Sequence, residues 1–204
     1  MKNIAIIPIR SGSERIKHKN IKLLAGYPLI YYQIECAKQV NGIQKIVVVT
    51  DNEQYGEIAK QYDVEVIILP PDITGLYSKS EDVLLNVLSK LKGAGEVFDN
   101  VILLQTANPL NKPEFLRQGL EMIETGNYSS ILTYCAFMGF LLDDHELIKR
   151  PMSQQKSPHK METGCFWITN VNKLEQERNR ISEPCGYVKV SQRAALEIDT
   201  PDDL

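Results

Sequence analysis

A polar run directly after the first apolar segment carries the residues best suited to chemistry: Arg10, Ser11, Gly12, Ser13, Arg15, Lys19 and Asn20. The small residues allow backbone N–H groups to approach phosphate oxygens, and the arginine and lysine side chains can neutralise phosphate charge. From Arg10 to Lys22, five cationic residues stand against one glutamate, although the chain has a net charge of -3. The run therefore indicates a phosphate loop. Because its spacing fits neither common glycine-rich phosphate motif, a solvated basic loop is the alternative.

The elements that must position this loop alternate between apolar runs and amphipathic stretches. The apolar runs predict strands over residues 3–9, 45–50, 64–69, 100–105, 129–135, 164–168 and 187–190. Spacings near 3.6 predict helices over residues 29–40, 52–61, 80–92 and 113–124. Right-handed crossovers would stack these elements into an α/β fold, a three-layer αβα sandwich with a mostly parallel, Rossmann-like sheet. Ligands of such sheets bind at the carboxyl ends of the strands, where the polar run begins.

Length and composition exclude several classes of protein. The 204 residues suit a single domain, and 43% hydrophobic and 24% charged residues are typical of a soluble globular protein. No apolar stretch reaches the roughly 18 residues that span a bilayer, and the negative net charge argues against binding nucleic acid or a membrane surface. The four cysteines form no Cys-x-x-Cys pair, and no leader is recognised, so we expect free thiols in the cytoplasm.

Residues 137 to 160 break the alternation with a charged stretch that has no clean period. Loops of this length are rarely idle in compact domains. We expect an insertion or a dimerisation arm there, within one domain that spans residues 1–204.

Four motifs resemble those of the acylneuraminate cytidylyltransferases. Residues 6–22 are similar to the nucleotide loop of that family, I-P-A-R-G-G-S-K-R-I-P-R-K-N-I-K, and residues 25–30 are similar to A-G-K-P-L-I. Residues 103–110 resemble L-L-Q-P-T-S-P-L, and residues 197–204 resemble D-I-D-T-P-E-D-F. The motifs follow the family's order and approximate spacing, and together they cover nearly the whole chain.

The resemblance implies an enzyme that joins CTP to an acidic 2-keto-3-deoxy sugar of the sialic, legionaminic or pseudaminic acid type. The anomeric hydroxyl would attack the α-phosphorus, and pyrophosphate would leave. Such a transfer needs in-line positioning and charge neutralisation, so Mg²⁺ is the implied cofactor. The resemblance also implies a role in cell-surface polysaccharide biosynthesis and a homodimer whose subunits complete each other's sugar sites.

Roles at the nucleotide follow from the same resemblance. Arg10 and Lys19 would hold the phosphates, with Ser13 and the loop amides beside them. Asn20 would contact the nucleotide, and Ser80 would meet its cytidine end. A serine before two acids is also an ordinary helix cap, which is the alternative for Ser80.

Roles at the sugar and the metal follow in the same way. Gln105 would lie near the acceptor sugar, although it could equally be a polar strand end. Asp199 and Glu197, on one face of an extended segment, would ligate Mg²⁺ as hard oxygen donors. The alternative is a helix start with Thr200 as cap and Pro201 in the first turn. The predicted catalytic residues are Arg10, Lys19, Gln105 and Asp199.

Departures from the family pattern fall within the motifs themselves. Glu14 replaces a lysine, so we expect its carboxylate to point away from the phosphates, and Ser11 replaces a glycine. Residues 70–72 lack an arginine. Glu197 replaces the first aspartate of Asp-x-Asp, and residues 162–166 stand where the pattern is nearly Asn-Gly-Ala-x-Tyr.

Three functional hypotheses therefore stay open. The first is a Mg²⁺-dependent cytidylyltransferase. The second is a catalytically impaired, nucleotide-binding paralogue with a regulatory or assembly role, and the third is a nucleotidyltransferase that uses another base. The sugar carboxylate needs a cation, for which the candidates are Lys149, Arg150, Lys156 and Lys160; any of them could instead belong to a solvated face.

Overall fold

The computed structural model describes residues 1–75, 78–139, 152–155 and 157–204. Its main sheet is built from β1 Asn3–Pro8, β4 Ile43–Thr50, β5 Glu65–Ile68, β6 Asn100–Leu104, β7 Ser130–Phe137, β8 His159–Asn170 and β9 Cys185–Lys189. The strand order is β5-β4-β1-β6-β8-β7-β9. Strand β8 runs antiparallel to both of its neighbours, and the other pairings are parallel. The predicted mostly parallel sheet is confirmed.

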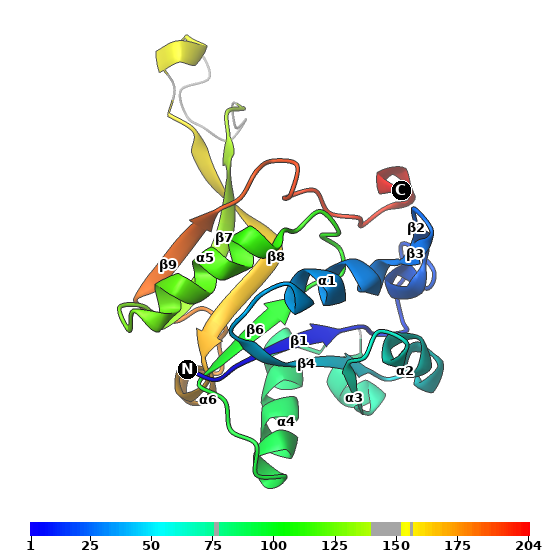
Figure 1. Ribbon diagram of the computed structural model, residues 1–204. Helices are drawn as coiled ribbons and strands as arrows, with labels where there is room; N and C mark the ends of the chain where they lie inside the picture. Colours follow the sequence, from blue (N-terminus) through cyan, green and yellow to red (C-terminus); the bar gives the residue numbers. More distant parts are fainter. Residues whose placement is uncertain (76–77, 140–151, 156) are drawn as a thin grey trace.

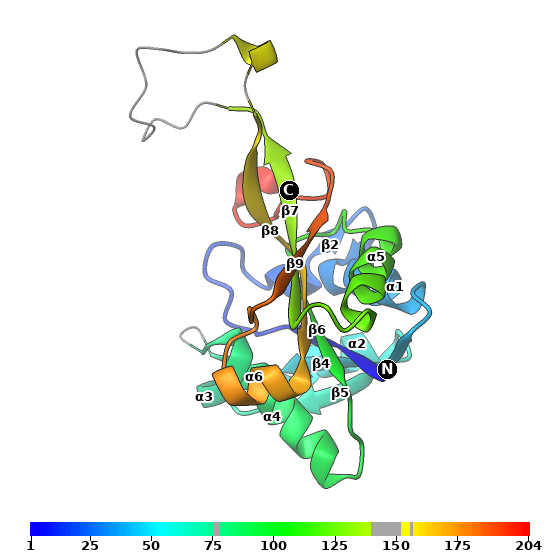
Figure 2. The same ribbon diagram turned by 90° about the vertical axis from the view of Figure 1, so that its left-hand side faces the viewer.

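Helices cover both faces of the sheet and complete three layers (Figure 1). One face carries α1 Leu29–Lys38, α2 Glu53–Lys60 and α5 Pro113–Glu124. The other face carries α3 Pro71–Thr74, α4 Ser80–Gly93 and α6 Val171–Glu177. A small hairpin of β2 Leu23–Leu24 and β3 Tyr27–Pro28 precedes α1. In Figure 2 the two helical layers lie on opposite sides of the sheet.

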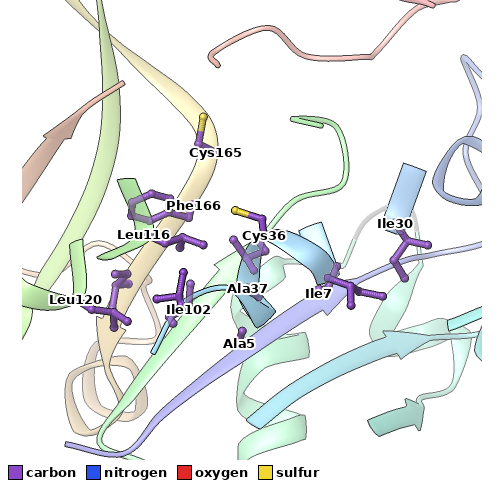
Figure 3. Packing of buried hydrophobic residues seen from close by; sticks show 14 of the residues in the cluster. Ala5, Ile7, Ile30, Cys36, Ala37, Ile102, Leu116, Leu120, Cys165 and Phe166 are labelled. Carbon is purple, nitrogen blue, oxygen red and sulfur yellow. The ribbon is translucent and has the colours of Figure 1, made fainter. Parts of the chain in front are cut away.

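The core explains why the strands are apolar almost throughout. In β1, Ala5 and Ile7 pack against one helical layer, and Ile4 and Ile6 pack against the other, all fully buried. A strand that is buried on both faces has no polar face, so its sequence is continuously apolar. Figure 3 shows Phe166 of β8 beside helix α5 in the first of these clusters.

The predicted secondary structure differs from the structure at one strand and lacks two short helices. Strand β8 begins at His159 and not at residue 164, because its polar first half pairs with β7. Helices α3 and α6 were not predicted, because elements of four and seven residues are too short to show a helical period.

Strands β7 and β8 continue past the rest of the sheet as a two-stranded arm, up to the pair Phe137 and His159 (Figure 2). The predicted irregular segment therefore begins and ends in paired strands. Lys149, Arg150 and Lys156 lie outside the described residues. The ammonium of Lys160 is 5.3 Å from the centre of the Tyr134 ring on the arm. Among the described helices, none is long and apolar enough to cross a membrane.

The contact of α5 with β8 generates a stability prediction. A Cβ at Gly119 would lie 2.9 Å from both Ile168 Cδ1 and Phe166 Cε2. Gly119→Ala should lower the free energy of unfolding by about 1–2 kcal/mol, because overpacking outweighs the gain in helix propensity. Urea denaturation would measure this change. Gly93→Ala is the matched control, since its Cβ would meet nothing within 4 Å; equal stability of the two variants would contradict the packing.

Candidate active site

A cavity of about 420 Å³ opens at the carboxyl ends of β1 and β6. Five segments contribute most of its lining: the loop after β1, the end of α3 with the residues that follow it, the start of α4, the turn after β6 and the segment that precedes the C-terminus. Of the predicted site residues, the cavity brings together Arg10, Ser13, Arg15, Lys19, Asn20, Ser80, Gln105, Glu197 and Asp199. This is the edge at which ligands of parallel sheets bind.

Ser11 and Gly12 do not line the cavity, and their contact with phosphate stays a prediction. The amide of Ser11 donates to Asp51 Oδ1 at 2.8 Å, and its hydroxyl donates to Asp51 Oδ2 at 3.1 Å. Asp51 follows strand β4, the neighbour of β1. Ser11 therefore ties the loop to the sheet. Asp51 was not identified from the sequence. Its position directly after the strand predicted over residues 45–50 was the one sign of a role.

Asn20 is buried and serves as a clamp within the protein. Its Nδ2 donates to the carbonyl of Arg10 at 2.9 Å, and its Oδ1 accepts a hydrogen bond from Thr106 Oγ1 at 2.5 Å. Both ends of the Asn20 amide are thus hydrogen-bonded within the protein. The sequence motifs had predicted a contact with the nucleotide and not this internal role. The clamp fixes the loop that carries Arg10 to the turn after β6.

Lys19 lies in a short 3-10 helix, η1 Lys19–Ile21, and joins the loop to the far end of the chain. Its Nζ donates to Asp199 Oδ1 at 2.9 Å and to the carbonyl of Ile198 at 3.0 Å. Arg15 lies 3.3 Å from the second oxygen of Asp199. The hydrogen bond from Lys19, helped by the charges of Lys19 and Arg15, lowers the pKa of Asp199 despite partial burial. The loop after β1 and the segment near the C-terminus therefore meet at this ion pair.

The segment before the C-terminus is held beside the turn that follows β6. The amide of Ile198 donates to the carbonyl of Ala107 at 2.8 Å. Thr200 and Asp203 form a capping box around the 3-10 helix η3 Pro201–Asp203. The predicted helix start is therefore correct, and it is compatible with a role for Asp199, whose carboxylate faces Lys19.

Three further residues have clear positions. Gln105 follows β6 directly and lines the cavity. Ser80 is the first residue of α4 and also lines the cavity. The N-cap of α4 is Lys79, whose side chain makes no capping hydrogen bond, so the alternative role of Ser80 as the helix cap is wrong. Glu14 lines the cavity as well. The expectation that Glu14 is turned away from this space is therefore not supported.

The residues present fit Mg²⁺ bound together with phosphate. Asp199 and Glu197 both line the cavity and offer hard carboxylate oxygens. In the described part of the chain, no group of three or more histidine, cysteine, aspartate or glutamate side chains forms a cage for a metal ion. Mg²⁺ commonly takes one or two carboxylates and completes its shell with water and substrate phosphates. Asp199 and Glu197 would supply that share of the ligands.

The clamp generates a prediction for the buried hydroxyl of Thr106. Thr106→Val should lower the free energy of unfolding by about 1–3 kcal/mol, because Asn20 Oδ1 would remain buried without its donor. Thr106→Ser keeps the hydroxyl and is the control. Urea denaturation of the two variants measures the difference in their free energies of unfolding. A valine variant as stable as the serine variant would contradict the clamp.

The lowered pKa of Asp199 generates an acid-stability prediction. Since the folded-state pKa lies below the unfolded value of about 3.9, the carboxylate stabilises the protein above that pH, and this contribution is lost as the pH falls through the folded-state pKa. Asp199→Asn should therefore show a smaller loss of unfolding free energy than wild type between about pH 6 and about pH 3. Urea denaturation at both pH values measures it. The exposed Asp63 provides the control Asp63→Asn, and equal acid sensitivity of the two variants would contradict the ion pair.

Comparisons with known proteins agree with this geometry. A family model described as Cytidylyltransferase matches residues 4–190. The CMP-N,N'-diacetyllegionaminic acid synthase of Legionella pneumophila is 30% identical over 218 residues, which cover 100% of this chain and 93% of that protein. An N-acylneuraminate cytidylyltransferase of Streptococcus agalactiae is 27% identical to this chain. The match covers 100% of this chain and 52% of that longer protein.

A solved structure shows the same fold. CMP:2-keto-3-deoxy-manno-octonic acid synthetase complexed with CTP is 20% identical, with a TM-score of 0.76 over 99% of this chain and 95% of that one. The family match and the full-length identity to the Legionella protein confirm the resemblance of the sequence motifs. The chain belongs to the cytidylyltransferase family, and within it to the acylneuraminate cytidylyltransferases.

Proposed function

We propose that this protein transfers the cytidylyl group of CTP to the anomeric hydroxyl of an acidic 2-keto-3-deoxy sugar of the sialic, legionaminic or pseudaminic acid type. The products are a CMP-sugar and pyrophosphate. Membership of the family makes the protein a nucleotidyltransferase. The observation that carries the proposal is the cavity in which the cationic loop after β1 meets the carboxylates near the C-terminus.

The cationic end of the cavity suits a triphosphate. Arg10, Arg15 and Lys19 line it together with Ser13, and they outnumber the one acidic residue of the same loop, Glu14. Asp199 accepts a hydrogen bond from Lys19 and forms an ion pair with Arg15. Phosphate oxygens are alternative acceptors of the same kind, because cation-to-oxyanion hydrogen bonds are short and strong. Lys19 and Arg15 are thereby placed for the phosphates before CTP arrives.

The metal-binding role belongs to Asp199 and Glu197 in this proposal. Bound Mg²⁺ would neutralise charge on the phosphates and favour the departure of pyrophosphate. The chain's own residues do the remaining work. Arg10 and Lys19 orient the phosphates, and the Asn20 clamp keeps Arg10 in place.

The opposite side of the cavity suits the nucleoside and the sugar. Ser80 starts α4 and lies beside Val83 and Leu103, which add apolar surface to the cavity wall. Gln105 lies on the wall formed by the turn after β6. We assign the cytidine to the region of Ser80, and the acceptor sugar to the region of Gln105. Such fixed placement provides the in-line geometry that phosphoryl-type transfer requires.

The proposal extends to assembly and location. The arm of β7 and β8 and the neighbouring edge strand β9 expose Met138, Met161 and Tyr187, each about half accessible. Apolar side chains gathered on a projecting element favour a contact with a second copy of the chain. We therefore propose a cytoplasmic homodimer that supplies activated sugar for cell-surface polysaccharide.

A pyrophosphate-release assay that crosses CTP with several acidic sugars tests the function. Wild-type protein should release pyrophosphate when both Mg²⁺ and an acidic sugar are present. Asp199→Asn should lower kcat by at least about 100-fold, because it removes charge that acts on the transferring group, with a much smaller loss of CTP affinity. Asp63→Asn is the control.

Two outcomes would count against the proposal. Absence of turnover with every sugar refutes it, and tight CTP binding without release would favour a nucleotide-binding paralogue. An unchanged kcat in Asp199→Asn would remove the assignment of that carboxylate.

A further inference from the structure

Strand β8 has an irregularity in its pairing with β7, next to Glu197 of the cavity wall. Strand β8 pairs with β7 through Trp167 opposite Leu132 and Thr163 opposite Thr133. Those pairs are adjacent on β7, but residues 164–166 lie between them on β8. These three residues therefore form a bulge. Bulges are frequent beside active sites, where they change the direction in which a strand presents its groups.

Side chains stabilise the bulge by donating hydrogen bonds to backbone carbonyls around it. Thr133 Oγ1 donates to the carbonyls of Thr163 at 3.0 Å and of Phe166 at 3.4 Å. Asn111 Nδ2 donates to the carbonyl of Cys165 at 3.3 Å. The bulge is thus a hydrogen-bonded feature that other elements hold in place.

The bulge presents the amide of Gly164 to Glu197. The Gly164 N–H donates to Glu197 Oε1 at 3.0 Å. A Cβ at Gly164 would lie 2.5 Å from Glu197 Oε1, 2.8 Å from Asn108 Oδ1 and 3.0 Å from Gln105 Oε1. Three side-chain oxygens therefore converge on the space that any larger residue would fill. Only glycine leaves that space to them.

Two of the three converging oxygens belong to residues of the cavity wall. Glu197 and Gln105 line the cavity, whereas Asn108 is fully buried, with an Oδ1 that finds no hydrogen-bond donor among the described residues. Glu197 and Gln105 are therefore the acceptors that this wall presents to a ligand, and a Cβ at position 164 would press on both of them.

Gly164 and Glu197 make the closest of these contacts. A Cβ at Gly164 would lie 2.5 Å from Glu197 Oε1, so any residue with a side chain at position 164 would displace the carboxylate of Glu197.

We propose that Gly164 and Glu197 are a matched pair in which Gly164 is the positioning residue. Because Gly164 has no side chain, Glu197 can anchor on the amide of the bulge, and this anchor fixes its carboxylate beside Gln105 on the wall that we assign to the acceptor sugar. The inference rests on the proposed function for the identity of the ligand. The pairing itself rests on the contact alone.

A double-mutant cycle of Gly164→Ala and Glu197→Asp tests the pair. Gly164→Ala should lower Tm by about 5 °C through overpacking. The double variant should recover at least half of that loss, because the shorter side chain withdraws from the added methyl group. In the release assay Gly164→Ala should lower kcat/KM for the sugar by about tenfold, with KM for CTP changed less than about twofold. Gly93→Ala is the control for the added methyl group.

The outcomes separate the pair from the proposed function. If Glu197→Asp does not reduce the Tm loss caused by Gly164→Ala, or if both the single and the double variant fail to fold, the pair is overturned. An unchanged Tm in Gly164→Ala overturns it as well. A wild-type protein without turnover would refute the proposed function, and the Tm cycle would still decide the pair. A parallel rise in KM for CTP and for the sugar would show a general structural effect in place of positioning.

Discussion

The ion pair between Lys19 and Asp199 connects residues that are 180 positions apart in the chain. It joins the cationic loop after β1 to the segment that precedes the C-terminus, and so closes the cavity on one side. The ammonium of Lys19 is mostly buried, which strengthens its attraction to the carboxylate relative to a fully exposed pair. The cavity thus contains cations that are held in position by a carboxylate. An incoming triphosphate would meet a prearranged set of donors.

The remaining geometry of the cavity depends on polar anchors at the sheet edge. Asp51 holds the loop through Ser11, and Asn20 joins the loop to Thr106. The strands beneath are apolar and buried on both faces, so the edge itself is rigid. Loops on a rigid scaffold are where binding and catalysis commonly reside. In this protein each loop of the cavity has at least one side-chain hydrogen bond to a neighbouring element.

Much of the fold and part of the site could be predicted from the sequence. Apolar runs located the strands, and the position of the polar run after the first strand placed Arg10 and Lys19 at the ligand edge. The first half of β8 escaped prediction because its side chains are mostly polar and exposed, so no alternation marks it. The bulge at residues 164–166 could not be predicted, since register there is set by Thr133 and Asn111. Asp51 was missed because its partner Ser11 lies 40 residues earlier.

The most direct test of the central claim is the affinity for CTP of Lys19→Met, measured by calorimetry beside Lys17→Met. Lys17 belongs to the same loop, is exposed and does not line the cavity. Lys19→Met should weaken CTP binding by about tenfold or more, because one charge-assisted hydrogen bond is lost and Asp199 is left without its main partner. Lys17→Met should bind like wild type. Equal affinities of the two variants would contradict a triphosphate bound between the loop and the C-terminal segment.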